Sequence, residues 1–442
     1  MNRYKQLSIF VAVFILCLTT LFSNVSWKAK AAEDPLGLSA EAAILLDGDT
    51  GRILYEKNAD VVLGVASMSK MMTEYLVLEA IHEGKITWDQ TVNINEYVHR
   101  LSAAPGLSNV GLTQGEDYTV EELYQAMAIH SGNAATVALA ELIGGTEKNF
   151  VELMNKKADE LKLEDYKFVN SSGLNNSSLL GNHPAGGQDD ENVMSAKATA
   201  RLAYRLLTDY PEVLDTASQP RLPFKDGKTY DNFNFMLPTL VHEYEGIDGL
   251  KTGSTDFAGY CFTATAKRGD QRFISVVMKT ESMNTRFSET AKVMNYAFSN
   301  FGKEKIFDEN HQVKGQETVP VTKGKEDHVN VQAADELVLT IKNGEKDDYK
   351  PKLVLDKELL NEDGELTAPI EKGQQIGYMT VEPKNGEGVS FLTSEGQKTI
   401  QVPVVAAEEV EKANWFVLSM RGIGGFFGDL FSSVASAVKG LF

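Results

Sequence analysis

A serine and a lysine three residues apart are the first residues of this chain whose types and spacing suggest chemistry. The stretch "VASMSKMM", residues 65–72, places Ser67 and Lys70 in a segment whose apolar spacing predicts a helix over 67–84. Side chains at i and i+3 of a helix lie on one face, close enough to hydrogen-bond. Lys70 can act as the base for a nucleophilic Ser67 if its pKa falls by about 3 units, at a cost of roughly 4 kcal/mol. Burial, a neighbouring cation and a helix N-terminus all lower a lysine pKa.

This pair alone is a weak signal, because the same spacing recurs at Ser436 and Lys439. The alternative interpretation of Ser67 and Lys70 is an ordinary amphipathic helix start. The motif Ser131-Gly132-Asn133, which supplies a hydroxyl and an amide, is an equally weak signal by itself, because Ser282-Met283-Asn284 repeats its spacing. Polar caps at a helix junction are the alternative there.

A third motif, Lys251-Thr252-Gly253, is more specific because it occurs once in the sequence. It falls in "GIDGLKTGS", a stretch that predicts a strand, and Ser254 follows it. The order of the three motifs places Ser131 64 residues after Ser67, and Lys251 120 residues later still.

The elements around these motifs predict an α/β (α+β) fold. Strand hairpins are predicted in "AEAAILLDGDTGRILYEKN" and in "GYCFTATAKRGDQRFISVVMKT", the second turning at 268–270. Further helices are predicted from Thr119, where Thr119 and Glu122 form a capping box, and over 285–301. We therefore expect early and late strands to share one antiparallel sheet flanked by helices. Residues 170–192 predict a long loop, and such loops are more often functional than idle.

The length of 442 residues and the change of texture along the chain predict several domains. We expect a catalytic domain over 32–307 and a small all-β domain over 308–406, where short apolar runs alternate with Gly, Asp, Asn and Lys turns. The composition, 43% hydrophobic and 24% charged, does not suggest disorder as the main state.

The two ends of the chain predict export and membrane attachment. Residues 1–31 carry basic residues, the apolar run "LSIFVAVFILCLTTLF" and a small-residue "AKA" site, the pattern of a signal peptide cut before Ala32. An uncleaved anchor is the alternative. Residues 407–442 place apolar side chains on one helical face, which predicts an interfacial amphipathic anchor. A membrane span, or a helix packed on the protein itself, are the alternatives there.

The charge and the cysteines exclude several classes of function. The formal net charge is −19; residues 1–31 hold four basic residues and no acidic one, which leaves 39 basic and 62 acidic residues, net −23, after processing. Nucleic acid is therefore an unsuitable partner, and attraction to anionic lipid does not explain the tail. Cys261 is the only cysteine after Cys17 leaves with the signal peptide, so no internal disulfide is expected. The sequence shows neither C-x-x-C nor H-E-x-x-H, and we expect no metal and no cofactor.

In their order, and with the export signal, the β-rich segment and the tail, the three motifs give a specific resemblance. The chain resembles the low-molecular-weight penicillin-binding proteins. Within that group it is similar to the D-alanyl-D-alanine carboxypeptidases of the penicillin-binding protein 5 type, which belong to peptidase family S11. The resemblance covers nearly all of the chain after the signal peptide. It implies a serine peptidase that removes the terminal D-alanine from peptidoglycan stem peptides through an acyl-enzyme, regulates wall cross-linking and binds β-lactam antibiotics. It also implies a place on the outer face of the cytoplasmic membrane.

The resemblance also implies a role for each motif residue. Ser67 is the expected nucleophile, Lys70 its base, and Ser131 the relay that passes the proton to the leaving amine. The expected substrate-binding residues are Asn133 for a substrate amide, Lys251 and Thr252 for the terminal carboxylate, Gly253 and Ser254 on the same strand, and Arg286 as a clamp for that carboxylate. The backbone N–H groups of Ser67 and Ser254 would form the oxyanion hole. A plain surface arginine is the alternative for Arg286.

The sequence lacks motifs that other functions require. A Ser-His-Asp hydrolase needs a G-x-S-x-G elbow, which is absent, and His130 beside Ser131 would point away from it on a helix. A β-lactamase needs Glu-x-x-x-Asn in the water-positioning loop, and no asparagine stands four residues after Glu164 or Asp165. His183 in the 170–192 loop inherits no role. A non-enzymatic β-lactam sensor or wall scaffold stays open as a third class.

Overall fold

A computed structural model describes residues 34–384 and 388–415 of the chain. The predicted signal peptide, 1–31, and residues 416–442 of the predicted anchor lie outside the described residues. Ahead of Ser39, the carboxylate of Asp34 accepts hydrogen bonds from the N–H groups of Leu36 (3.0 Å) and Leu38 (2.8 Å), which close a turn. All elements below belong to the unit that begins at Ser39.

A five-stranded antiparallel sheet joins the two ends of the predicted catalytic region. The order is β10-β11-β12-β1-β2, and β1 pairs with β12 along its whole length, from Ala42 with Met278 to Asp47 with Phe273. Both predicted hairpins and the shared sheet are confirmed. The strands are β1 (Ala42–Asp47), β2 (Ile53–Lys57), β10 (Ile247–Thr255), β11 (Gly259–Arg268) and β12 (Gln271–Thr280). Among the described strands β10 pairs only with β11, so it forms one edge of the sheet.

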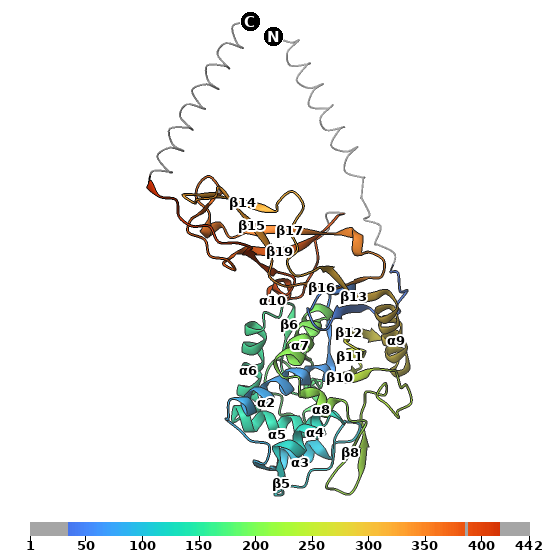
Figure 1. Cartoon of the computed structure of the whole chain (residues 1–442). Coiled ribbons are helices and arrows are strands. Elements are labelled where there is room, and N and C mark those ends of the chain that lie inside the picture. Colours follow the sequence, from blue (N-terminus) through green and yellow to red (C-terminus); the bar gives the residue numbers. More distant parts are fainter. Residues whose placement is uncertain (1–33, 385–387, 416–442) are drawn as a thin grey trace, which may run out of the picture. The chain divides into compact units, whose positions relative to one another are not determined.

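Helices flank this sheet, as predicted, and Figure 1 shows α7 and α9 on either side of its strands. Helix α9 (Met283–Asn300) packs against β11 and β12, and α7 (Ala196–Asp209) against β1 and β12. The remaining helices of this region are α2 (Lys70–His82), α3 (Glu96–Ser102), α4 (Val120–Ala128), α5 (Asn133–Gly144), α6 (Glu147–Glu160) and α8 (Val213–Ala217). Short strands lie between them and form a three-stranded sheet β3-β7-β6 and the pairs β4-β5 and β8-β9. Their bounds are β3 (Val62–Gly64), β4 (Thr91–Asn93), β5 (Asp117–Thr119), β6 (Tyr166–Lys167), β7 (Val193–Ser195), β8 (Arg221–Pro223) and β9 (Thr229–Asp231).

Local sequence signals explain where these helices begin. The Thr119 hydroxyl accepts from the Glu122 N–H (3.1 Å) and the Glu122 carboxylate accepts from the Thr119 N–H (2.8 Å), so the predicted capping box is present at α4. The helix predicted over 67–84 begins with a 3₁₀ turn, η1 (Ala66–Ser69), and continues as α2 to His82. The predicted loop 170–192 holds only the short 3₁₀ turn η2 (Asn176–Ser178) before β7.

The rest of the described chain is rich in short strands with their own apolar core. A six-stranded sheet has the order β17-β19-β20-β15-β14-β18, and β13 pairs with β16. The elements are β13 (Phe301–Phe307), β14 (Thr318–Thr322), β15 (His328–Ala333), β16 (Leu337–Lys342), η3 (Lys346–Asp348), β17 (Tyr349–Leu355), η4 (Lys357–Leu359), β18 (Leu366–Thr367), β19 (Gln375–Pro383), α10 (Ser394–Lys398) and β20 (Val402–Ala406).

Two contacts bear on the predicted domain boundaries, which stay predictions. Strand β13, which ends at Phe307, forms its ladder with β16 rather than with the five-stranded sheet. At the other end, Val410 is fully buried in the β-rich core and exchanges backbone hydrogen bonds with Ile370 (3.0 and 2.9 Å). Part of the predicted anchor, within its first nine residues 407–415, therefore packs with the β-rich part.

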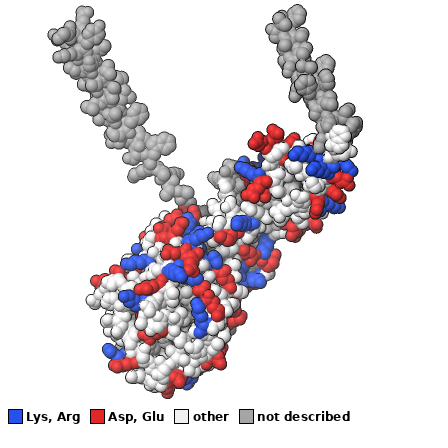
Figure 2. All heavy atoms as spheres, turned by 90° about the vertical axis from the view of Figure 1, so that its left-hand side faces the viewer, with Lys and Arg blue, Asp and Glu red and all other residues white. Residues whose placement is uncertain are grey.

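Acidic and basic side chains are interspersed on the molecular face drawn in Figure 2, and no large area there is only basic. Within the ranges 34–384 and 388–415, none of the helices is both long and apolar enough to cross a membrane.

Candidate active site

The 3₁₀ turn η1 holds Ser67 in place through a strained backbone. Ala66, directly before the serine, has φ +47°, and the Ser69 hydroxyl donates to its carbonyl (2.7 Å). Gly173 of the loop packs so closely on that carbonyl that an added Cβ would lie 1.9 Å from it, so only glycine fits. Strain of this kind is characteristic of functional sites, where the surrounding structure over-determines one geometry.

Lys70, the first residue of α2, points its amine at this serine. Its Nζ lies 2.9 Å from Ser67 Oγ, 2.8 Å from Asn133 Oδ1 and 2.7 Å from the carbonyl oxygen of Ser172. The side chain is fully buried. Burial lowers the pKa of Lys70 well below its ordinary value, the nearby charge of Lys251 lowers it further, and the charge of Glu74 opposes the shift.

The three contacts of the amine give a neutral Lys70 one orientation. A neutral amine has two N–H donors and one lone pair. The Ser172 carbonyl can only accept, and Asn133 also accepts, because its Nδ2 is held by the Ser108 carbonyl (2.9 Å). Both N–H groups are thereby engaged, so the lone pair faces the Ser67 hydroxyl. This is the arrangement that a general base needs.

Ser131 and Asn133 lie at the junction of α4 and α5. Ser131 has φ +56° and its Oγ, which is buried, has no hydrogen-bond partner among the described residues. A buried unpaired hydroxyl costs free energy unless a ligand completes it. Asn133 starts α5 and uses both side-chain polar groups within the protein, on Lys70 and Ser108. The structure thus gives Asn133 a contact with Lys70 in addition to its place in the cleft.

The predicted strand carries Lys251 and brings Gly253 against the serine. Lys251 is buried on β10, and burial lowers its pKa to about 8; the charge of Glu74 raises that pKa and the charge of Arg286 lowers it. An added Cβ on Gly253 would lie 2.5 Å from the Val65 carbonyl oxygen and 3.0 Å from the Ser67 nitrogen. The absence of a side chain at 253 therefore lets β10 approach η1.

Arg286 is not a plain surface residue, since it is buried on α9. Its guanidinium donates to the Gly253 carbonyl (3.4 Å) and lies 4.7 Å from the centroid of the Phe287 ring. Its Nε has no partner among the described residues, and burial lowers its pKa to about 10. Arg286 lines the same cleft as Ser67 and remains a cation at neutral pH.

Together these residues form a polar cleft of about 440 Å³. Of the predicted site residues, its lining includes Ser67, Ser131, Asn133, Thr252, Gly253, Ser254 and Arg286. Lys70 and Lys251 lie buried beneath the lining, and Lys70 reaches the cleft through Ser67. The cleft thus presents the Ser67 hydroxyl in contact with a buried amine, the buried hydroxyl of Ser131 and the guanidinium of Arg286, a group suited to a carboxylate.

Sequence reasoning missed several groups that take part in this arrangement. The Ser172 carbonyl is backbone and leaves no sequence signal, whereas Glu74 stands four residues after Lys70 and was visible as an acid on the same helix face. Burial raises the pKa of Glu74 to about 7, against the lowering influence of Lys251 and Lys70. Glu191, also missed, lines the cleft and accepts from the Thr255 hydroxyl (2.7 Å).

The residues considered for the alternative functions do not line the cleft. His130 Nδ1 lies 2.8 Å from the Asp231 carbonyl oxygen and its ring stacks on Phe233, with centroids 4.8 Å apart. His183, Glu164 and Asp165 are not among the residues that line the cleft. Among the described residues, no cluster of three His, Cys, Asp or Glu side chains is placed to hold a metal ion.

Comparison with known proteins identifies the family. The model of the D-alanyl-D-alanine carboxypeptidases of peptidase family S11 matches residues 28–282, and that of the penicillin-binding protein 5 C-terminal domain matches 301–412. The D-alanyl-D-alanine carboxypeptidase DacF of Bacillus subtilis is 32% identical over 95% of this chain and 98% of its own length. The DacA protein of Haemophilus influenzae is 30% identical over 95% and 96%.

Solved structures give the same result. A peptidoglycan synthesis regulatory factor (PBP3) of Streptococcus pneumoniae has a TM-score of 0.69 at 34% identity, covering 85% of this chain and all of that one. Penicillin-binding protein 5 of Haemophilus influenzae has a TM-score of 0.66 at 29% identity, covering 85% and 98%. The chain belongs to the S11 family of serine D-alanyl-D-alanine carboxypeptidases and has the fold of penicillin-binding protein 5 with its C-terminal β domain.

Proposed function

We propose that the chain is a serine D-alanyl-D-alanine carboxypeptidase that trims peptidoglycan stem peptides, with Ser67 as nucleophile and Lys70 as base. One observation carries these roles: Lys70 Nζ lies 2.9 Å from Ser67 Oγ while its other two contacts are hydrogen-bond acceptors. Desolvation and the Lys251 charge favour the neutral amine. Trimming removes the D-alanine whose release drives cross-linking, so the enzyme regulates how far the wall is cross-linked.

Acylation follows from this geometry. The Ser67 oxygen attacks the carbonyl carbon of the penultimate D-alanine while Lys70 takes its proton, and the backbone N–H groups of Ser67 and Ser254 stabilise the oxyanion. The C–N bond then breaks. The leaving nitrogen takes a proton through the Ser131 hydroxyl, and terminal D-alanine departs. Water hydrolyses the Ser67 ester, which releases the shortened peptide and regenerates the serine.

The carboxylate of the substrate has three candidate partners. Lys251 and Arg286 carry positive charge at neutral pH, and the Thr252 hydroxyl, which lines the cleft, can donate to an oxygen of the same carboxylate. A β-lactam presents a similar carboxylate beside a reactive carbonyl, so it would acylate the same serine. A penicillin-binding protein of Listeria monocytogenes in this fold group, TM-score 0.51, has been solved in an ampicillin-bound form.

Replacing the nucleophile tests this function. We expect Ser67→Ala to abolish labelling by a fluorescent penicillin and release of D-alanine from a pentapeptide, with an unchanged circular dichroism spectrum. Labelling of Ser67→Ala at the wild-type rate would rule out the proposed nucleophile. A β-lactamase would turn over penicillin rapidly, whereas a sensor would label with penicillin but release no D-alanine from the pentapeptide.

We also propose that the enzyme is exported and attached to the outer face of the cytoplasmic membrane by its C-terminal segment. The motivation is the sequence of residues 1–31 and 416–442. About five large apolar side chains buried at an interface contribute on the order of 10 kcal/mol before ordering costs. The net −23 of the processed chain opposes anionic lipid, so apolar contact has to supply the attachment.

A further inference from the structure

Glu147 is a buried carboxylate that no motif of the family predicted. It is the first residue of α6 and is 6% exposed. Its Oε1 accepts from the N–H of Ser171 (3.0 Å) and from the Ser171 hydroxyl (2.6 Å), and its Oε2 has no hydrogen-bond partner in the described ranges. The buried carboxylate is thus committed to one residue of the loop 170–192, and it does not line the cleft.

The residue that Glu147 holds stands next to a contact of the catalytic lysine. The Ser171 carbonyl accepts from the hydroxyl of Thr73 (2.8 Å), and the Ser172 carbonyl accepts from Lys70 Nζ (2.7 Å). Both partners are on α2, one turn apart. The Ser171–Ser172 segment therefore lies between Glu147 on one side and the face of α2 that carries the base on the other.

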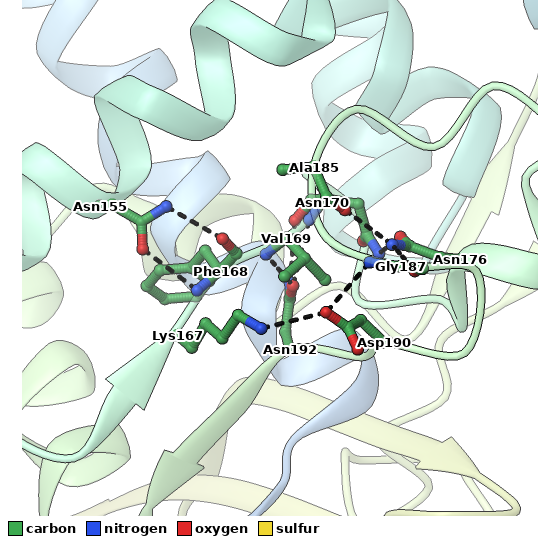
Figure 3. Close-up of polar contacts among 10 residues, drawn as sticks. All are labelled: Asn155, Lys167, Phe168, Val169, Asn170, Asn176, Ala185, Gly187, Asp190 and Asn192. Carbon is green, nitrogen blue, oxygen red and sulfur yellow. Dashed lines mark hydrogen bonds and ion pairs between the residues drawn. The ribbon is translucent and has the colours of Figure 1, made fainter.

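Asparagine side chains fix the backbone on both sides of this segment. Before it, Asn192 Oδ1 accepts from the N–H groups of Val169 (2.7 Å; Figure 3) and Asn170 (3.1 Å). Asn170 Oδ1 accepts from the N–H groups of Ser172 (3.2 Å) and Gly173 (2.7 Å). Ser171 lies between these two anchor points, and the group that holds its N–H is the carboxylate of Glu147.

We propose that Glu147 is a positioning residue that, by holding Ser171, aims the Ser172 carbonyl at Lys70 and so turns the lone pair of the amine toward Ser67. The proposal rests on the proposed function, because the direction of this lone pair matters only if Lys70 is the base. When the carbonyl acceptor moves away, a neutral amine is free to rotate and presents N–H to Ser67 in part of the population. A displacement of about 1 Å in such a group costs about 10²-fold in rate.

Three variants test the proposal, with acylation by a fluorescent penicillin resolved into noncovalent affinity and the first-order acylation rate. We expect Glu147→Ala to lower the acylation rate about 10- to 100-fold and to leave the affinity within about twofold. Glu147→Gln keeps an acceptor oxygen for Ser171 and should restore the rate to within about threefold of wild type. Ser171→Ala loses only the 2.6 Å hydroxyl contact and should lower the acylation rate by a smaller factor. This variant tests the proposal even if Glu147→Ala does not fold.

Asn155 provides the matched control. It lies on the same helix and holds the backbone of Phe168, two residues before the loop 170–192 and three before Ser171: its Oδ1 accepts from the Phe168 N–H (3.2 Å) and its Nδ2 donates to the Phe168 carbonyl (2.9 Å), as Figure 3 shows. Asn155→Ala therefore loosens the loop without a direct contact to Ser171 or Ser172, and we expect an acylation rate close to wild type.

Three results would overturn the positioning role: a wild-type acylation rate in both Glu147→Ala and Ser171→Ala, no restoration by Glu147→Gln, or equal losses in Glu147→Ala and Asn155→Ala. The last would mean that Glu147 only stabilises the loop. A failure of the proposed function is distinguishable, because the wild-type protein itself would then show neither acylation nor D-alanine release.

Discussion

At the residue scale, Glu74 sets the charge balance between the two lysines of the site. It is 2% exposed on α2, one turn after Lys70. Its charge raises the pKa of Lys70 and of Lys251, while burial lowers both. Burial raises the pKa of Glu74 itself to about 7, so its carboxyl is largely ionised at pH 8, where Lys251 titrates. Glu74 thus helps Lys251 to keep its positive charge, which we propose binds the substrate carboxylate.

Replacing Glu74 should move the alkaline limb of the pH profile of penicillin acylation. Lys251 is a cation below its pKa of about 8 and loses its charge above it, so carboxylate binding falls as the pH rises through about 8. In Glu74→Gln the supporting negative charge is gone, the pKa of Lys251 falls, and the alkaline limb of penicillin acylation moves to lower pH. Glu83→Gln at the exposed C-terminal end of α2, where Glu83 pairs with Lys85, is the control. An unmoved or raised limb in Glu74→Gln would contradict this balance.

Replacing Ser131 should lower the activity without lowering the stability. Because it is buried without a partner among the described residues, Ser131→Ala removes an unpaired polar group and should leave the thermal midpoint unchanged or raised. D-alanine release should fall about 10²-fold or more, since proton transfer to the leaving nitrogen loses its relay. Ser275→Ala on β12 removes another buried, unpaired hydroxyl and should keep full activity. Equal activity in the two variants would exclude the relay.

At the scale of elements, the site depends on how closely β10 approaches η1. Gly253→Ala would place a Cβ 3.0 Å from the Ser67 nitrogen and 2.5 Å from the Val65 carbonyl oxygen, both backbone atoms that cannot turn away. We expect a folded protein whose acylation rate falls about 10²-fold, because the oxyanion donors separate. Gly187→Ala, whose Cβ would meet nothing nearer than 3.9 Å, should react like wild type. Normal acylation of Gly253→Ala would show that this close packing is dispensable.

The parts of the site that follow local rules were predictable from the sequence. The Ser67–Lys70 contact follows from helical spacing, the α4 capping box from Thr119 and Glu122, and the Lys251 strand from its flanking pattern. Contacts made by backbone atoms of distant loops were not predictable. The Ser172 carbonyl reaches Lys70 across 102 positions, and the Ser108 carbonyl orients Asn133 across 25. Carbonyls carry no residue type, so no motif reports where the fold brings them.

At the scale of the whole molecule, the described residues that line the cleft come from 67–286, and none of them belongs to the β-rich part. The fold class was predictable because the hairpin patterns at both ends of the catalytic region are strong. The pairing of β13 with β16 and the burial of Val410 were not, since short apolar runs do not specify their partners in a sheet.

Removing the C-terminal segment should separate membrane attachment from catalysis. The natural place to end the chain is after Trp415, because Val410 and Lys412 still form β-bridges to Ile370 and Gly324. A chain ending there should release D-alanine at the full-length rate and lose co-sedimentation with vesicles. For the full-length chain, sedimentation should not increase with the anionic lipid fraction, because the protein is net negative. Vesicle binding by the shortened chain would place the attachment elsewhere.

The protonation state of Lys70 is the most direct test of the mechanism. Titration of the Lys70 ε-carbon by ¹³C NMR in lysine-labelled protein, assigned by its absence in Lys70→Arg, reports the charge of this one amine. The mechanism predicts a resonance of the neutral amine at pH 7, with the ammonium form appearing only on acidification. A Lys70 resonance that stays that of an ammonium ion from pH 7 to pH 9 would contradict the role of this lysine as the base for Ser67.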